Sequence, residues 1–161
     1  ATDEAIDMVE LLSQVQRDFQ GPDTAQVVLN DESKAQLLGV RSELESVVVN
    51  LLSNAIRHTP QDGEITLTWR SGPDGAELIV QDTGEGIDEE DIPRLTERFF
   101  RVDRGRSRSK GGVGLGLAIV KHVLARHDAD VSIASQLESG STFTCHFPSA
   151  RVALAASPVL S

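Results

Sequence analysis

Apolar residues recur along the chain at two different periods, which predict helices and strands in a definite order. Residues 4 to 19 carry apolar side chains at steps of three and four, which predicts an amphipathic helix ending at Gly21-Pro22. The sequence Ser-x-x-Glu at 42–45 has the form of a capping box, and it opens a second run of helical spacing that ends before Pro60. A third helix is expected from Gly114 to about His127.

Alternating apolar and polar residues between these helices predict strands. The segment from Val27 to Asn30 predicts a short strand, and two hairpins follow, one turning at 71–75 and the other at 138–140. The runs that pair in these hairpins are 65–69 with 77–81 and 131–135 with 141–147. This order predicts an α+β two-layer sandwich, with helices on one face of a mixed, largely antiparallel sheet.

The length of 161 residues fits one domain with a single core. We expect this domain to occupy residues 1–148. Residues 149–161 are rich in Ala and contain Pro158, so we expect them to form a disordered tail. Residues 83–112 show no regular pattern, and so long an irregular stretch in a compact domain is usually functional or mobile.

The charge and cysteine content narrow the choice of partners. The chain has 15 Lys and Arg against 25 Asp and Glu, a net charge of −10, which repels nucleic acid and anionic lipid. The single cysteine, Cys145, excludes an intrachain disulfide, and no apolar run approaches the roughly 20 residues that a membrane-spanning helix needs. We therefore expect a cytoplasmic segment with no direct contact to nucleic acid or membrane.

Two asparagines stand on one polar face of the second predicted helix. Glu43, Asn50, Asn54 and Arg57 lie within about 60° of one another in a helical projection, opposite the apolar stripe. Mg²⁺ takes only one or two protein oxygens when phosphates and water supply the rest, so the amide oxygen of Asn54 is a candidate ligand. The alternative is a solvated polar face, although two asparagines inside a helix need a reason, because asparagine is a poor helix former.

A carboxylate and two glycines follow the first hairpin as Asp82-Thr-Gly-Glu-Gly86. A carboxylate at the end of a strand can accept a hydrogen bond from an adenine amino group. Gly84 and Gly86 permit positive φ and a close approach of backbone to a ligand. The alternative is an ordinary turn in which Asp82 caps the backbone.

A second glycine-rich segment, containing Gly112, Gly114 and Gly116, leads into the last predicted helix. The unpaired N–H groups and the positive dipole end of a helix N-terminus favour phosphate. The segment lacks the Lys-Ser/Thr ending of a P-loop and the preceding strand of a Rossmann unit. Six basic residues from Arg98 to Lys110 face a single acid in that stretch and can neutralise a triphosphate.

The four histidines and one cysteine form no cluster typical of a metal site or of a nucleophilic triad. His58 ends the second predicted helix, where it can reach a phosphate or satisfy the helix C-terminus. His122, His127 and His146 show no partner pattern, and Cys145 is expected to be buried.

Four segments in this order resemble the N, G1, F and G2 boxes of sensor histidine kinases. They are 50–59, 82–86, 98–103 and 112–121, within a similarity that covers residues 5–148. Residues 92–103, together with 107–112, are particularly similar to the phosphate-regulon sensor kinases. The resemblance implies a Bergerat (GHKL) ATPase fold in which ATP lies under a flexible lid of about residues 88–112.

The resemblance also implies roles for individual residues. Asp82 holds the adenine amino group, Asn54 holds Mg²⁺, and Asn50, Asn54 and Arg101 are the catalytic set. The other residues implied in ATP binding are Arg57, His58, Gly84, Gly86, Ile87, Lys110, Gly112, Val113, Gly114, Leu115, Gly116, Leu117 and Thr142. His58 stands where many relatives have Tyr, and Val113 stands where Thr or Ser is frequent.

The family's acceptor motif, a His followed by an acidic residue and shortly by Thr-Pro, is absent, since His58-Thr-Pro60 lacks that spacing. The resemblance therefore implies a domain that donates the γ-phosphate of Mg-ATP to a histidine on a separate dimerisation and phosphoacceptor domain of the same kinase. A response regulator is then an indirect partner, and the kinase is anchored in a bacterial inner membrane.

Two alternative functions remain open. An ATPase of the wider superfamily would need a carboxylate base where Asn50 stands. An anti-sigma-factor-type kinase or binding module is disfavoured by the sequence Phe-Phe-Arg-Val-Asp at 99–103.

Overall fold

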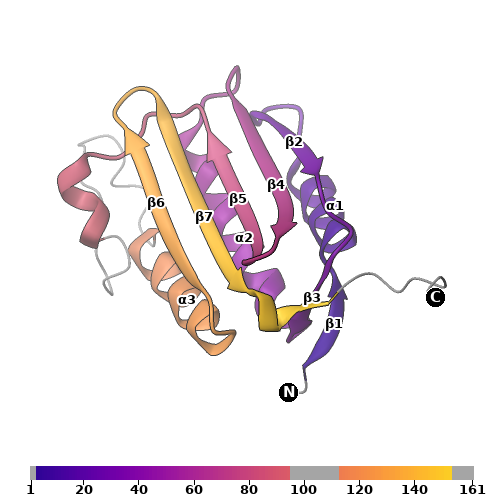
Figure 1. Cartoon of the computed structure of the whole chain (residues 1–161). Helices are drawn as coiled ribbons and strands as arrows, with labels where there is room; N and C mark the ends of the chain where they lie inside the picture. The colour runs from indigo at the N-terminus through magenta and orange to yellow at the C-terminus, as the bar shows by residue number, and fades with distance from the viewer. Residues whose placement is uncertain (1–2, 95–112, 154–161) are drawn as a thin grey trace.

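The computed structural model describes residues 3–94 and 113–153 and places a layer of helices on one face of a β-sheet (Figure 1). The sheet has the strand order β2-β4-β5-β7-β6, in which β2 and β4 run parallel and all other neighbours run antiparallel. Its strands are β2 (Gln26–Asp31), β4 (Glu64–Gly72), β5 (Gly75–Asp82), β6 (Asp130–Gln136) and β7 (Gly140–Pro148). The predicted two-layer α+β architecture, including both hairpins, is confirmed.

Three helices, α1 (Met8–Phe19), α2 (Arg41–His58) and α3 (Val113–Arg126), cover the same face of this sheet (Figure 1). The core lies between the layers, where alternate residues of β4 (Ile65, Leu67 and Trp69) are fully buried. Trp69 meets Phe147 edge to face, with ring centroids 6.3 Å apart, and its Nε1 donates to the Ala35 carbonyl at 3.0 Å. Each such large apolar side chain contributes about 1.5–3 kcal/mol on burial, so the pairing of the two layers dominates stability.

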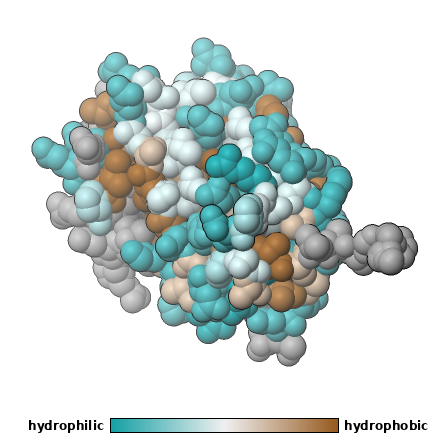
Figure 2. Space-filling model, viewed as in Figure 1, coloured by the Kyte–Doolittle hydropathy of each residue, from teal (hydrophilic) through white to brown (hydrophobic). Residues whose placement is uncertain are grey.

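The opposite face of the sheet carries no helix among the described residues, and it is mostly hydrophilic or neutral (Figure 2). Thr66 and Thr68 on β4 and Thr142 and Thr144 on β7 are partly exposed there, alternating with buried apolar residues. β-Branched residues fit a half-exposed pleated surface, which explains why this face needs no second layer.

A second, three-stranded sheet has the order β1-β3-β8, all antiparallel. Its strands are β1 (Glu4–Asp7), β3 (Gln36–Gly39) and β8 (Val152–Ala153). The expected helix over 4–19 is therefore wrong at its start. Residues 4–7 pair with β3, and the Asp7 side chain caps α1 by accepting from Glu10 N–H at 3.1 Å.

The described part of the expected tail is ordered, since 149–151 form a 3-10 turn (η3, Ser149–Arg151) that leads into β8. Arg151 bonds Asp3 at 2.8 Å and Asp128 at 3.1 Å, which ties this turn to β1 and to the α3–β6 connection. In the expected irregular stretch, 89–94 form a second 3-10 helix (η1, Glu89–Arg94), and 95–112 lie outside the described residues.

The predicted capping box is wrong, because α2 begins one residue before Ser42 and its N-cap, Val40, makes no side-chain cap hydrogen bond. The Val40 N–H instead donates to His127 Nε2 at 3.1 Å, and His127 Nδ1 lies 2.9 Å from the Val123 carbonyl. His127 is 1% exposed, so a neutral imidazole with its proton on Nδ1 satisfies both contacts without burying a charge. A buried histidine thus joins the start of α2 to the end of α3.

This junction leaves no space at Gly39, where a Cβ atom would lie 2.5 Å from His127 Cδ2. We predict that Gly39→Ala lowers the free energy of unfolding by about 1–3 kcal/mol, because His127 must move and strain its two hydrogen bonds. Urea denaturation measures this. Gly72→Ala is the matched control, because nothing lies within 4 Å of a Cβ atom at Gly72. Equal effects of the two substitutions would contradict the packing argument.

Candidate nucleotide-binding site

Several of the predicted site residues lie on α2 or on the loop after β5, and the end of α2 and this loop meet the β6–β7 turn. The Glu85 N–H donates to the carbonyl of His58, the last residue of α2, at 3.2 Å. The Glu85 carbonyl accepts in turn from the N–H of Glu138, in the β6–β7 turn, at 2.7 Å. Backbone hydrogen bonds therefore fix three segments that are far apart in the sequence.

Asp82, the last residue of β5, is a buried carboxylate with 5% of its surface exposed. Its Oδ1 accepts from the Gly84 N–H at 2.8 Å and from the Ser141 N–H at 3.3 Å, while no hydrogen bond to Oδ2 occurs among the described residues. Desolvation raises the pKa of Asp82 above its ordinary value of 3.8, although the two backbone N–H groups oppose that shift. Asp82 therefore caps the turn through Oδ1, as the alternative interpretation expected, while Oδ2 remains available to a ligand.

The glycines of this loop allow it to pack closely against backbone carbonyl groups of neighbouring segments. A Cβ atom at Gly84 would lie 2.1 Å from the His58 carbonyl oxygen, and one at Gly86 would lie 2.1 Å from the Gln136 carbonyl oxygen. Gly86 has the expected positive φ, 76°, whereas no positive φ occurs at Gly84. The close approach expected toward a ligand is therefore observed toward α2 and β6.

Asn54, on α2, is 6% exposed, and its Oδ1 has no hydrogen-bond partner among the described residues. A buried amide oxygen without a partner costs about 1–3 kcal/mol, so Asn54 is not an ordinary solvated residue. One turn earlier, Asn50 Nδ2 donates to the Ser46 carbonyl at 2.7 Å, which orients its amide. Arg57 is exposed on the last turn of the helix.

His58 makes a contact that the sequence did not indicate. Its Nδ1 lies 2.7 Å from Glu85 Oε2, and 19% of the His58 side chain is exposed. Glu85 was not among the predicted site residues. The only signal in the sequence was its position between the two glycines of the loop.

The side chain of Thr142 does not reach this site. It pairs across the sheet with the exposed Gln81, on the face opposite Asp82. The neighbouring Ser141 instead pairs with Asp82 and is 6% exposed, and its Oγ lies 2.8 Å from Ser135 Oγ. The alternation of β7 could have identified Ser141, since it stands two residues before the buried Phe143.

Ser135 links the remaining part of the loop to the sheet. Its Oγ accepts from the Ile87 N–H at 2.7 Å and donates to the Gly140 carbonyl at 3.0 Å. Ile87, one of the predicted site residues, is partly buried and packs against the hydrophobic core.

The glycine-rich segment before the last helix is only partly described. Residues 113–116, Val113 to Gly116, form the first turn of α3, and Leu117 is 2% exposed in the core. The predicted Arg101, Lys110 and Gly112, and most of the expected lid, lie outside the described residues.

The arrangement offers the carboxylate of the buried Asp82 and the buried amide oxygen of Asn54 on adjoining elements, β5 and α2. A carboxylate can bind an amino group of a base, and an amide oxygen can bind a hard cation, so the chemistry fits a metal-bound purine nucleotide. No helix within the described ranges is long and apolar enough to cross a membrane.

Comparison with known proteins identifies the family of this chain. Residues 39–151 match the family model of histidine kinase-, DNA gyrase B- and HSP90-like ATPases. The phosphate regulon sensor protein PhoR of Pseudomonas aeruginosa is 49% identical over 146 residues, which cover 89% of this chain and 33% of PhoR. The chain thus spans about a third of the length of that relative.

Two solved structures share the fold. The mycobacterial sensor histidine kinase MprB superposes with a TM-score of 0.74 at 26% identity, covering 91% of this chain and 97% of that one. Full-length ShkA in complex with AMPPNP superposes with a TM-score of 0.79 at 26% identity, covering 98% of this chain and 32% of that one. The chain therefore belongs to the histidine kinase-, DNA gyrase B- and HSP90-like ATPase family, as an ATP-binding histidine kinase catalytic domain.

Proposed function

We propose that this domain binds Mg-ATP and donates the γ-phosphate to a histidine on a separate dimerisation and phosphoacceptor domain of the same kinase. The observation that carries the proposal is that Asp82 and Asn54 are both buried, and that Asn54 Oδ1 has no hydrogen-bond partner among the described residues. Both groups are costly to the apo fold, and a nucleotide with its metal satisfies both. The complex of the related ShkA with AMPPNP, an ATP analogue, supports this ligand.

In this proposal Asp82 accepts from the adenine amino group through its available oxygen, and the Asn54 amide oxygen binds Mg²⁺. Asn50, Arg57 and His58 then approach the phosphates from the same helix. Arg101, Lys110, Gly112 and the first turn of α3, Val113 to Gly116, remain proposed phosphate contacts. The Ser141 N–H holds Asp82 in place at 3.3 Å. Mg²⁺ supplies charge neutralisation for the phosphoryl group when it is bound.

Phosphoryl transfer is favoured over ATP hydrolysis by the identity of residue 50. Hydrolysis needs a base that takes a proton from water, and an amide has no basic site at neutral pH. The Asn50 side chain is also held by its bond to Ser46. Positioning and charge neutralisation are then the main contributions of the domain, as in phosphoryl transfer generally.

The rest of the kinase supplies the remaining functions. Since the chain spans about a third of PhoR, we propose that the acceptor domain and the sensor lie in other parts of a membrane-anchored protein, with this domain in the cytoplasm, where ATP is available. The name of that relative, a phosphate regulon sensor protein, makes phosphate the proposed stimulus. A response regulator is the proposed indirect partner. The net charge of −10 disfavours nucleic acid as a ligand.

We predict that Asp82→Asn weakens Mg-ATP binding about ten- to a hundredfold, because a charge-assisted hydrogen bond of about 1.5–3 kcal/mol is lost. The free energy of unfolding at pH 7 should not fall. The pKa of Asp82 is raised in the fold, so its ionisation destabilises the folded state increasingly as pH rises through that pKa, and Asn cannot ionise. Calorimetry measures the change in Mg-ATP affinity, and urea denaturation measures the free energy of unfolding.

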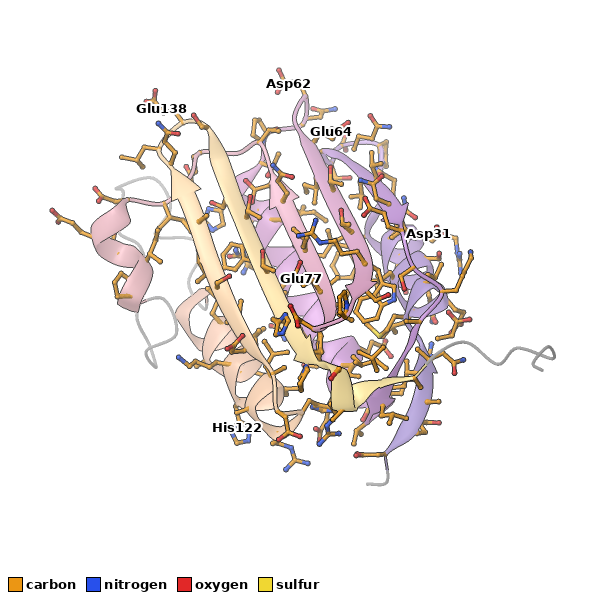
Figure 3. All side chains as sticks on the ribbon, viewed as in Figure 1. Asp31, Asp62, Glu64, Glu77, His122 and Glu138 are labelled. Carbon is orange, nitrogen blue, oxygen red and sulfur yellow. The ribbon has the colours of Figure 1, made fainter. Side chains whose placement is uncertain are left out.

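Asp62→Asn, at an exposed position near the same end of the sheet (Figure 3), is the control. ATP affinity within twofold of the parent would refute the adenine assignment.

Asn54→Ala should weaken nucleotide binding chiefly when Mg²⁺ is present, because the metal joins the amide oxygen to the phosphates. We expect at least a tenfold loss in excess Mg²⁺ and a smaller loss in EDTA, together with loss of phosphotransfer. Ser53→Ala, on the adjacent position of α2, is the matched control. Equal losses in both buffers would show that Asn54 supports the fold or contacts the nucleotide itself.

Incubated alone with Mg-ATP, the domain should bind nucleotide and acquire no acid-labile phosphate, because none of its four histidines stands in an acceptor motif. Mixed with a separately made acceptor domain, it should transfer the γ-phosphate slowly, since the tether that raises the effective concentration is missing. Labelled ATP and acid-stability assays measure both. Phosphohistidine on the isolated domain, or fast hydrolysis without acceptor, would overturn the proposal.

A further inference from the structure

The end of α2 and the loop after β5 are joined by one residue from each side, His58 and Glu85. Their side chains meet at 2.7 Å, between His58 Nδ1 and Glu85 Oε2. Their backbones meet as well, since the Glu85 N–H donates to the His58 carbonyl at 3.2 Å. The carbonyl oxygen of His58 also lies where a Cβ atom on Gly84 would be 2.1 Å away. The two segments therefore touch through both backbone and side chains.

These two segments carry different halves of the site. The loop begins at Asp82, whose carboxylate faces the base in the proposed function. The helix carries Asn54 one turn before His58 and Asn50 one turn earlier still, and these face the metal and the phosphates. The separation between the two halves is set by how the loop sits on the helix end. The His58–Glu85 contact is the only side-chain hydrogen bond between loop 83–87 and α2 among the described residues.

The contact is partly shielded from water, with 19% of the His58 side chain and 39% of the Glu85 side chain exposed. A carboxylate within hydrogen-bond distance requires the proton of the imidazole on Nδ1, so Glu85 fixes the ring orientation in either charge state. The Gly84 N–H donates to Asp82 Oδ1 at 2.8 Å, and Gly84 packs directly against the His58 carbonyl. The pair thus lies beside the carboxylate that it would position.

We propose that Glu85 is a positioning residue, which holds His58 and thereby sets the spacing between the adenine-binding loop and the metal-binding face of α2. This inference rests on the proposed binding of Mg-ATP. Glu85 touches neither the base nor the phosphates in this role. It aligns the two halves so that one nucleotide engages both.

If Glu85 sets this spacing, the loss of affinity on its removal should depend on whether the ligand is long enough to reach both halves of the site. Adenosine engages only the loop and needs no alignment with α2, whereas Mg-ATP engages both halves together. Loss of the contact should therefore weaken Mg-ATP and leave adenosine unchanged. A substitution that merely damaged the loop would weaken both ligands by the same factor.

The experiment measures the dissociation constants of Mg-ATP and of adenosine by NMR titration for the parent domain, Glu85→Ala and Glu85→Gln. We expect Glu85→Ala to weaken Mg-ATP about three- to fivefold, the upper part of the range typical of a partly exposed contact between polar side chains. Adenosine should change by less than 1.5-fold or so on the same reasoning. Glu85→Gln keeps an acceptor for His58 Nδ1 and should stay near the parent for both ligands. Glu64→Ala is the control, an exposed acid at the same end of the sheet (Figure 3).

A double-mutant cycle tests whether Glu85 acts through His58. In the His58→Ala background, Glu85→Ala should have no further effect on Mg-ATP. Unchanged or tighter Mg-ATP binding by Glu85→Ala, an equal loss for adenosine, or additive effects in the cycle would each overturn the inference. Measurements on the parent domain and on Asp82→Asn distinguish failure of this inference from failure of the proposed function. If the parent does not bind Mg-ATP, both the proposed function and the inference fail. If the parent binds Mg-ATP and Asp82→Asn weakens that binding, a negative result for Glu85→Ala removes only the positioning role of Glu85.

Discussion

Close backbone packing of the loop after β5 is the constraint on which the candidate site depends. The loop lies so close to the end of α2 and to the β6–β7 turn that a Cβ atom would not fit at Gly84 or at Gly86. A Cβ atom would not fit at Gly140 either, because Gly140 packs against the Asp82 carbonyl. Each contact places one backbone against another, so none can be relieved by moving a flexible side chain. As a result, the backbone of the loop is held against α2 and the β6–β7 turn, and the His58–Glu85 contact adds a side-chain link between the loop and the end of α2.

This packing holds polar groups where they are unfavourable to the fold alone. Asp82 is a buried carboxylate whose pKa burial raises, and the Asn54 amide oxygen has no partner among the described residues. The apolar layer between the helices and the sheet must offset these costs, and residues such as Trp69, Leu67 and Phe147 are fully buried in it. Real proteins tolerate such local costs mainly at functional sites, where a ligand can offset them.

Helix α2 is positioned at both of its ends. At its start, the Val40 N–H bonds the buried His127, and Glu43 makes a two-point contact with Arg126, near the end of α3, at 3.0 and 3.1 Å. At its end, His58 is bonded to Glu85. A helix fixed in this way cannot slide along the sheet, so the amides on its polar face keep their distance from the loop.

The sequence by itself determined the layers, the hairpins and most of the elements, because the period of buried residues fixes which face of each helix or strand meets the core. It also singled out Asp82 and Asn54 as candidates, Asp82 from the glycines that follow it and Asn54 because asparagine is a poor helix former. The start of α1, the cap of α2 and strands β1, β3 and β8 were decided only by tertiary structure. Each depends on a partner distant in the chain, such as β3 for residues 4–7 or His127 for Val40. The same holds for the site, since the roles of Ser141, Glu85 and the loop glycines arise from contacts between segments that no local pattern brings together.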